Sequence, residues 1–333
     1  MTDLNRRELL RGAFATALLP ALGAAAGSAR AADSGPYPTR PIKWVVPYLA
    51  GTGPDTTARI LAEAVGPILG QPLIIDNKAG AGGNIGARIV AKAAPDGYTL
   101  IYSAAPMAAN MHVYKNPGYD ALKDFRHIMR LTSSDIVLIV KADSDVRSLA
   151  DLVAKARAQP GKLSYASGGV GTPSHLGVEM LLSAEHVDVL HVPYKGASEL
   201  VNAVMGDQVL FGTPIFSVAY PLIQSGQLRA LAVAGRKRNP TLPDVPTLAE
   251  LGVKGAELTS WGGLSAPAGT PDAVVARIRD AFGQALARPE VVAALQQQGG
   301  QVDLLDAPAY VQGFKKEMAF TEQMMKKVGL EAM

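Results

Sequence analysis

The chain repeats one local pattern: a short apolar run, a loop of small residues, and a proline at the start of an amphipathic stretch. The first copy spans residues 43–64, where the apolar run 44–46 precedes the loop 50–53 (AGTG) and Pro54. Proline is favoured in the first turn of a helix because its missing N–H would have no partner there. We therefore expect a strand that feeds a helix through glycines, with unpaired N–H groups at the helix's positive end.

Further copies of this pattern follow, with predicted strands at residues 98–103, 163–167, 209–211 and 264–266 that lead to Ala-Pro or Gly-Thr-Pro. Apolar runs that alternate with helical stretches predict an α/β fold. In open α/β sheets, ligands bind beside the loops at the carboxyl ends of the strands. Helix starts in such loops favour an anion. The alternative is that these loops are simply well-capped helix starts.

Composition excludes several classes of protein. The 333 residues are 48% hydrophobic and 18% charged, which allows a large core and two domains of ordinary size. A net charge of +3 with scattered Lys and Arg does not indicate nucleic-acid binding. The chain contains no cysteine, which excludes disulfides, thiolate metal sites and a cysteine nucleophile.

The N-terminus predicts an export signal over residues 1–31. A charged segment with Arg6 and Arg7 precedes an apolar run too short to span a bilayer, and a small-x-small cleavage site ends at Ala31. The paired arginines resemble a twin-arginine signal, and general secretory export is the alternative. We expect the mature chain to begin near Ala32 and to be a soluble periplasmic protein.

Motifs for catalysis, metals and cofactors are absent from the sequence. It contains no GxSxG, HExxH or Walker loop. The glycine loop 80–86 misses the dinucleotide fingerprint by one position and has no acidic residue about 20 positions later, so we interpret it as a turn that lets a helix pack closely. We predict no catalytic residue, no metal and no cofactor.

Two titratable residues near helix starts have both a functional and a structural interpretation. His175 follows Thr172-Pro173-Ser174 and could donate to a bound carboxylate, act as a base for Ser174, or simply be satisfied by the backbone. Asp55 could contact a ligand, but an acidic residue in the first turn favours the helix dipole whatever the function. The sequence leaves these alternatives open.

Longer motifs cover nearly all of the predicted mature chain. They are YPTRPIKWVVPY (37–48), GPDTTARILAE (53–63), AGAGGNIGARIVAKAAPDGYTL (79–100), YDALKDF (119–125), AQPGKLSYAS (158–167), GTPSHLG (171–177), HVPYKGA (191–197), LRALAVAGRKRNPTLPDVPTLAELG (228–252) and SWGGLSAPAGTP (260–271). With these motifs the chain resembles the Bug family of periplasmic solute-binding receptors, which serve tripartite tricarboxylate transporters.

The resemblance implies an α/β type II periplasmic binding-protein fold, in which hinge strands join two domains around a ligand cleft. Domain I would comprise residues 32–137 and 258–333, and domain II residues 138–257, with crossings near 136–140 and 259–264. The implied ligand is a small carboxylate, and the implied partner is the membrane permease of a tripartite tricarboxylate transporter. We expect a monomer that is not an enzyme and does not insert into the membrane. The alternatives are a ligand-sensing receptor for a signalling partner, and a secreted hydrolase that uses Ser174 and His175.

Twelve residues follow as predicted ligand contacts. Those expected to bind the carboxylate through N–H and hydroxyl groups are Ala50, Gly51, Thr52, Ser167, Gly171 and Thr172. Those expected to shape the rest of the cleft are Tyr48, Asp55, Ser103, His175, Gly212 and Thr213.

Departures from the family pattern refine the expected ligand. Many relatives carry Asp where this chain has Gly212, and a buried ammonium needs a paired charge. We therefore expect a non-amino carboxylate, either a dicarboxylate or one with an apolar or aromatic body beside Tyr48, Met107 and Phe216.

Overall fold

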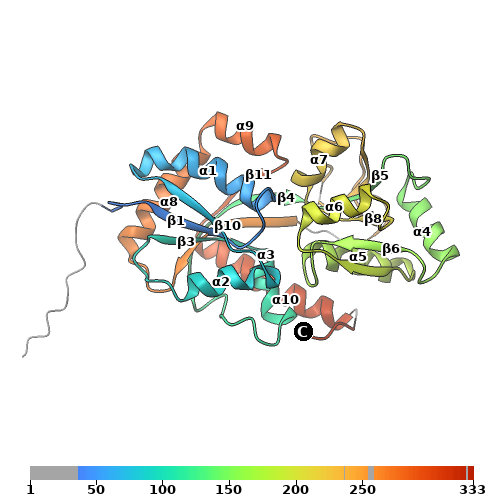
Figure 1. The fold of residues 1–333 in the computed structure, drawn as a ribbon, viewed down its shortest axis with the longest axis horizontal. Coiled ribbons are helices and arrows are strands. Elements are labelled where there is room, and N and C mark those ends of the chain that lie inside the picture. The colour runs from blue at the N-terminus through green and yellow to red at the C-terminus, as the bar shows by residue number, and fades with distance from the viewer. Residues whose placement is uncertain (1–36, 236, 254–258, 328) are drawn as a thin grey trace, which may run out of the picture. The chain divides into compact units, whose positions relative to one another are not determined.

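A six-stranded mixed sheet organises the first part of the structure (Figure 1). The computed structural model describes residues 37–235, 237–253, 259–327 and 329–333, and the predicted signal 1–31 with its cleavage site lies outside the described residues. The strand order is β11-β4-β10-β3-β1-β2. The strands are β1 (Ile42–Val46), β2 (Leu73–Asn77), β3 (Thr99–Ala104), β4 (Phe125–Asp135), β10 (Thr259–Pro267) and β11 (Gln301–Leu305). Strands β1, β2 and β3 are parallel, whereas β10 runs antiparallel to both β3 and β4.

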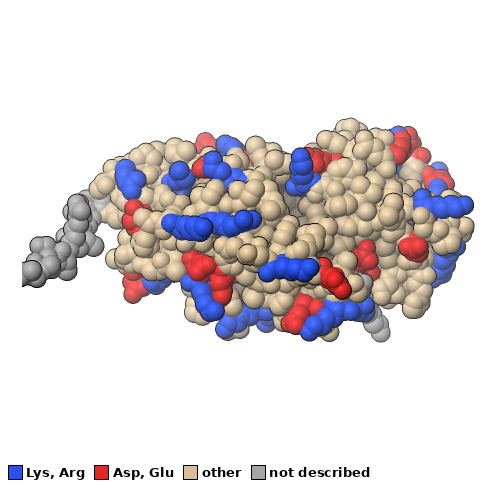
Figure 2. Space-filling view, turned by 60° about the horizontal axis from the view of Figure 1, so that its bottom comes forward, with Lys and Arg blue, Asp and Glu red and all other residues tan. Residues whose placement is uncertain are grey.

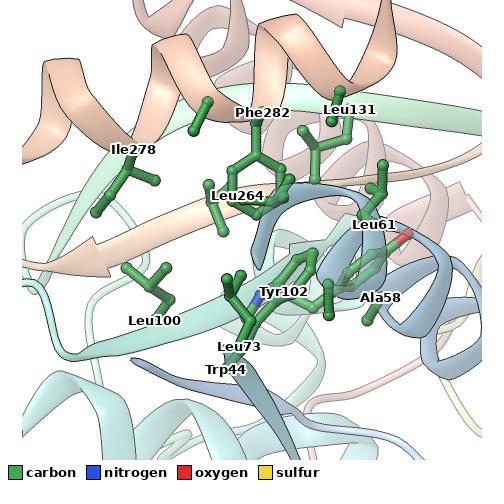
Figure 3. Close-up of a cluster of buried hydrophobic side chains, with 14 of the residues drawn as sticks. Trp44, Ala58, Leu61, Leu73, Leu100, Tyr102, Leu131, Leu264, Ile278 and Phe282 are labelled. Atoms are coloured by element: carbon green, nitrogen blue, oxygen red, sulfur yellow. The ribbon is translucent and has the colours of Figure 1, made fainter. Parts of the chain in front are cut away.

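Helices cover both faces of this sheet, and we call the sheet and its helices the first lobe. The helices are α1 (Gly53–Leu69), α2 (Asn84–Ala91), α3 (Ala105–Val113), α8 (Asp272–Leu286), α9 (Pro289–Gln297) and α10 (Ala307–Lys327). Successive side chains of a strand point to opposite faces. Accordingly Trp44 packs with Tyr102 and Phe282 under α1 and α8 (Figure 3), while Val45 joins Phe314 in the cluster beneath α10.

A five-stranded sheet with the order β7-β6-β8-β5-β9 forms the second lobe. Its strands are β5 (Val137–Lys141), β6 (Ser164–Ser167), β7 (Leu190–Pro193), β8 (Phe211–Gly212) and β9 (Leu228–Val233). Its helices are α4 (Leu149–Ala158), α5 (Pro173–Glu185), α6 (Ala197–Met205) and α7 (Phe216–Gln224). Separate hydrophobic clusters lie on the two faces of this sheet.

The lobes belong to one unit, Tyr37–Met333, and are connected at several places. Strand β4 of the first sheet continues through Ile136 into β5 of the second, and β9 is followed by β10 of the first sheet. Helix α10 makes a further connection that the sequence did not predict. Phe314 lies in the core of the first lobe, and Met324 lies in a cluster of the second. The domain boundaries 137/138 and 257/258 stay predictions.

Helix α1 shows why the first repeated pattern folds as it does. Thr52 caps the helix in an extended conformation and Pro54 lies in its first turn. Gly70 ends it at a φ of 77°, a left-handed angle that glycine adopts without strain. Pro67 lies in the last turn and does not interrupt the helix. None of the helices in the described ranges is long and apolar enough to cross a membrane.

Candidate functional site

A cleft of about 540 Å³ lies between the two lobes. This volume is in the range of small-molecule sites. The first lobe contributes residues of the β1–α1 loop, the glycine loop 79–83 and the adjoining ends of β4 and β10, while the second lobe contributes the loops before α5, α6 and α7. The cleft therefore depends on both lobes.

Helix starts surround this cleft. Helices α1, α5 and α6 begin at lining residues Gly53, Pro173 and Ala197, and α7 begins directly after the lining residue Ile215. The backbone N–H groups of Gly53 and Val170 donate no hydrogen bond to any described residue. Unpaired N–H groups at helix starts carry partial positive charge, so several such groups in one cleft favour an anion.

The charged side chains of the cleft also favour an anion. Lys195 is the one charged residue among the described lining residues, and its side chain is exposed. On the face seen in Figure 2, basic and acidic side chains are interspersed and do not form one large field. On this face, therefore, no single-sign field would steer an anion towards the cleft.

Two loops on different lobes have the same local geometry. Thr52 and Thr172 are the caps of α1 and α5, with φ of −79° and −70°. Each hydroxyl donates to the carbonyl three residues earlier, Leu49 or Gly169, at 2.7 Å. The glycine before each threonine, Gly51 or Gly171, has a φ of 78° or 75°. Both threonines line the cleft.

In each loop, the N–H of that glycine donates a hydrogen bond to a buried side chain of the following helix. Gly51 N–H donates to Asp55 Oδ2 at 2.9 Å, and Gly171 N–H donates to His175 Nδ1 at 3.0 Å. Asp55 and His175 each have 2% of their surface exposed and lie outside the cleft lining. They hold the glycine–threonine turns in place, and they occupy two N–H groups that the sequence assigned to the ligand.

Asp55 is a charged group with several partners. Arg59 Nε donates to its Oδ2 at 3.0 Å, and Asn77 Nδ2 donates to its Oδ1 at 2.9 Å. Burial acts to raise the pKa of Asp55, but the hydrogen bonds from Arg59, Gly51 and Asn77 outweigh it and hold that pKa below its ordinary value. Asp55 is therefore ionised at neutral pH.

His175 belongs to a neutral polar cluster in the second lobe. Its ring stacks on His191 with centroids 4.0 Å apart, and His191 Nε2 is 2.6 Å from Ser167 Oγ. Burial, with a contribution from His191, lowers the pKa of His175 to about 3, and burial lowers that of His191 to about 4. With Nδ1 engaged by Gly171, His175 is unsuited to act as a base.

Ser174 is also engaged by its own loop. Its Oγ accepts from Gly168 N–H at 2.9 Å and lies 3.0 Å from Thr172 Oγ1. Among the contacts of the described residues there is no hydrogen bond between Ser174 Oγ and the His175 ring. The hydrolase alternative therefore lacks its nucleophile–base pair.

Ser103 and Thr213 have structural partners. Ser103 is fully buried, with its Oγ 2.7 Å from Ser265 Oγ and 2.9 Å from Tyr310 Oη. Thr213 Oγ1 donates to the carbonyl of Ser174 at 2.6 Å. Both side chains therefore bond to other protein groups, and neither lines the cleft.

The twelve predicted contacts thus fall into two groups. Tyr48, Thr52 and Thr172 line the cleft. The residues placed outside the lining are Ala50, Gly51, Asp55, Ser103, Ser167, Gly171, His175, Gly212 and Thr213. Met107 and Phe216, expected beside an apolar part of the ligand, are buried in the hydrophobic clusters.

Several lining residues were missed by reasoning from the sequence. They are the glycine loop 79–83, the hydroxyl and aromatic residues Tyr102, Thr132, Ser133, Ser134, Ser260 and Trp261, and Lys195 and Ser217 of the second lobe. The sequence of the glycine loop predicts a turn that lets a helix pack closely, whereas in the structure residues 79–83 line the cleft. For the hydroxyl residues of β4 and β10 the chain offers no local signal, because only the pairing of these two strands brings them together, and the pairing of β10 with β3 adds Tyr102.

Groups of three or more His, Cys, Asp or Glu that could hold a metal ion are absent from the part of the chain that the structure describes.

Comparison with known proteins relates the chain to one family. The family model for the tripartite tricarboxylate transporter family receptor matches residues 57–330. The UPF0065 protein in the gbd 5′ region of Cupriavidus necator is 37% identical over 98% of this chain and 99% of its own length. Protein BugT of Bordetella pertussis is 33% identical over 90% of this chain and 93% of its own.

Solved structures agree with these matches. The periplasmic binding protein BugD is 36% identical, with a TM-score of 0.84 over 89% of this chain and 100% of its own. An R. palustris protein solved with adipate is 32% identical, with a TM-score of 0.86 over 89% and 100% of the two chains. MatC from Rhodopseudomonas palustris, solved with bound malate, is 30% identical, with a TM-score of 0.81 over 86% and 99%.

Proposed function

Because this chain belongs to the tripartite tricarboxylate transporter receptor family, we propose that it binds a small non-amino carboxylate between its lobes and delivers it to the permease of such a transporter. It would act in the periplasm after removal of a signal near Ala31–Ala32. The family and its solved neighbours are solute-binding proteins, and we assign no enzymatic activity.

The observation that carries this proposal is the pair of matching loops on opposite lobes. Thr52 and Thr172 both line the cleft, next to Gly53 and Val170, whose N–H groups donate to no described residue. A carboxylate between these loops would accept hydrogen bonds from both lobes. It would therefore bind the closed arrangement better than the open one and shift the population towards it.

The lining residues support a ligand without an amine. A buried ammonium needs a carboxylate partner, and among the described lining residues there is neither Asp nor Glu. Gly212, where the family pattern often has Asp, lies outside the lining. Lys195 and the hydroxyl residues of β4 and β10 would suit a second carboxylate, while Tyr48 and Trp261 would suit an apolar or aromatic body.

The ligands of similar solved structures support this ligand class. One R. palustris protein was solved with adipate and MatC with malate, and both ligands are dicarboxylates without an amine. We therefore place dicarboxylates first among the candidates and aromatic carboxylates second.

A thermal-shift screen would test the proposal. The purified protein is heated with mono-, di- and tricarboxylates, aromatic acids, and glutamate and aspartate. A ligand that binds the native state at a hundredfold excess over Kd adds about 2.7 kcal/mol of stability. We expect a shift of a few degrees with a non-amino carboxylate. Tight binding of glutamate or aspartate with no response to non-amino carboxylates would contradict the proposed ligand class.

A further inference from the structure

The first turn of α7 packs between two glycines of the other lobe. A Cβ added at Gly53 would lie 2.5 Å from both Ile215 Cδ1 and Ser217 Oγ. A Cβ added at Gly299 would lie 2.9 Å from Ser217 Cα and 3.0 Å from Ser217 N. Gly53 begins α1, and Gly299 lies between α9 and β11, so both belong to the first lobe. Ser217 is thus in close contact with two glycines of the opposite lobe.

The hydroxyl of Ser217 is buried without a partner. Its Oγ has no hydrogen bond among the described residues and is closed to water, although other atoms of the residue line the cleft. A buried hydroxyl without a partner is unfavourable relative to one in water. Because Gly53 and Gly299 of the other lobe lie against Ser217, we expect this cost to fall when the lobes separate.

We propose that Ser217 lowers the ligand affinity of this receptor by opposing closure of the lobes. Separation of the lobes returns its Oγ to water, and closure removes it from water without a replacement hydrogen bond. The free energy needed to bury this hydroxyl then reduces the ligand affinity that is measured. The idea rests on the proposed function, since it assumes a receptor that closes on its ligand.

The geometry distinguishes this role from a direct ligand contact. Ser217 Oγ lies against Gly53 and is closed to water, so a ligand oxygen cannot reach it in this arrangement. The two roles predict opposite effects of Ser217→Ala. Loss of a ligand contact weakens binding, whereas loss of an unpaired buried hydroxyl strengthens it.

The affinity test compares Ser217→Ala with the parent protein by titration with adipate and malate. We expect the Kd of a ligand that binds to fall by roughly fivefold or more, the lower end of what an unpaired buried hydroxyl costs. The matched control is Ser225→Ala, which removes an exposed hydroxyl at the other end of α7 and should leave Kd unchanged. An unchanged or higher Kd for Ser217→Ala would overturn the proposal.

A second measurement needs no ligand and separates this inference from the proposed function. The chain has no cysteine, so Glu63→Cys on α1 and Ala154→Cys on α4, both exposed, can be spin-labelled selectively. In the ligand-free protein, Ser217→Ala should shift the inter-label distances towards those of the arrangement described here. Identical distributions with and without the Ser217 hydroxyl would overturn the inference, even if carboxylates bind. If neither adipate nor malate binds, the distances still decide whether Ser217 opposes closure.

Discussion

Thr52 and Thr172 occupy equivalent positions on different lobes, each with its hydroxyl donating at 2.7 Å to the carbonyl three residues before it. The two hydroxyls differ in their other contacts, the first being the 3.0 Å approach of Thr172 Oγ1 to Ser174 Oγ. Thr172 Oγ1 also accepts from His175 N–H at 3.4 Å, whereas Thr52 makes no side-chain cap hydrogen bond to α1. The two helix starts therefore have the same loop geometry but different capping.

This difference predicts unequal costs for two matched substitutions. Thr52→Val removes one hydrogen bond and should lower the free energy of unfolding by about 1 kcal/mol. Thr172→Val also removes the cap of α5 and should cost about 1–2 kcal/mol. Urea unfolding of each variant measures the two costs. An equal or smaller cost for Thr172→Val would show that the cap does not stabilise α5.

Gly53→Ala should impair ligand binding without destabilising either lobe. The added Cβ would meet Ile215 and Ser217 of the second lobe at 2.5 Å, so the lobes could not approach as closely. We expect carboxylate affinity to fall about tenfold or more, equivalent to at least about 1.4 kcal/mol. Calorimetric titration measures the affinity, and thermal unfolding measures the stability.

The control for Gly53→Ala is Gly283→Ala in α8, where an added Cβ meets no atom within 4 Å. It should leave affinity unchanged and raise stability slightly, as alanine does in a helix. If Gly53→Ala bound carboxylates as tightly as the parent protein, the contact between α1 and α7 would not form in the bound state.

Asp55→Asn should destabilise the protein in a pH-dependent way. The folded-state pKa of Asp55 lies below its ordinary value of 3.8, so its charge stabilises the fold above that pH, and the contribution is lost as pH falls through the folded pKa. At pH 7 we expect a loss of about 1–2 kcal/mol, with the exposure of Arg59 keeping the effect modest. Urea unfolding at pH 7 and near pH 3 measures the difference in free energy of unfolding between the parent protein and Asp55→Asn, and this difference should be smaller near pH 3. An equal difference at both pH values would mean that the charge of Asp55 does not stabilise the turn.

Three histidines with lowered pKa values, two buried and one half-buried, should make stability fall in mild acid. Burial lowers the pKa of His127 to about 4, that of His175, with a contribution from His191, to about 3, and that of His191 to about 4, from an ordinary value of 6.5. Each stays neutral in the folded protein but takes up a proton on unfolding below pH 6.5. Their stabilisation is therefore complete above that pH and is lost as pH falls towards 4, at up to about 1.4 kcal/mol per pH unit for His127 and for His175 and at less for the half-buried His191, whose shift solvent screens.

Denaturant unfolding between pH 7 and pH 4.5 measures this loss. The His127 ring is held by two contacts, with Nδ1 2.8 Å from Ser265 Oγ and Nε2 2.9 Å from the carbonyl of Ala121. His127→Gln should reduce the slope of the free energy of unfolding against pH by the equivalent of one proton taken up on unfolding. An unchanged slope in His127→Gln would mean that this imidazole titrates alike in both states.

The family and the fold class could be predicted from the sequence, and the family match and solved neighbours confirm both. Long motifs such as residues 79–100 and 260–271 carried that prediction, because a match over many consecutive residues is far more specific than a single glycine loop. The strand–loop–helix pattern also located the β1–α1 and β6–α5 loops, where Thr52 and Thr172 line the cleft.

The individual contacts were harder to predict, for a physical reason. A glycine loop indicates free N–H groups, but which of them stay free depends on side chains further along the helix. Asp55 and His175 occupy the N–H groups of Gly51 and Gly171, and nothing in the local pattern distinguishes these acceptors from ligand contacts. Ser217 depends on the approach of Gly53 from the other lobe, which lies more than 150 positions earlier in the sequence.

The most direct test of the account is a calorimetric titration of a matched ligand pair. The carboxylate that shifts the melting temperature most in the screen is compared with its primary amide, which has nearly the same shape but no charge. Helix starts and N–H groups in the cleft should favour the anion, so we expect the amide to bind at least about a hundredfold more weakly, or about 2.7 kcal/mol. Equal affinities for the two would contradict a carboxylate held between the Thr52 and Thr172 loops.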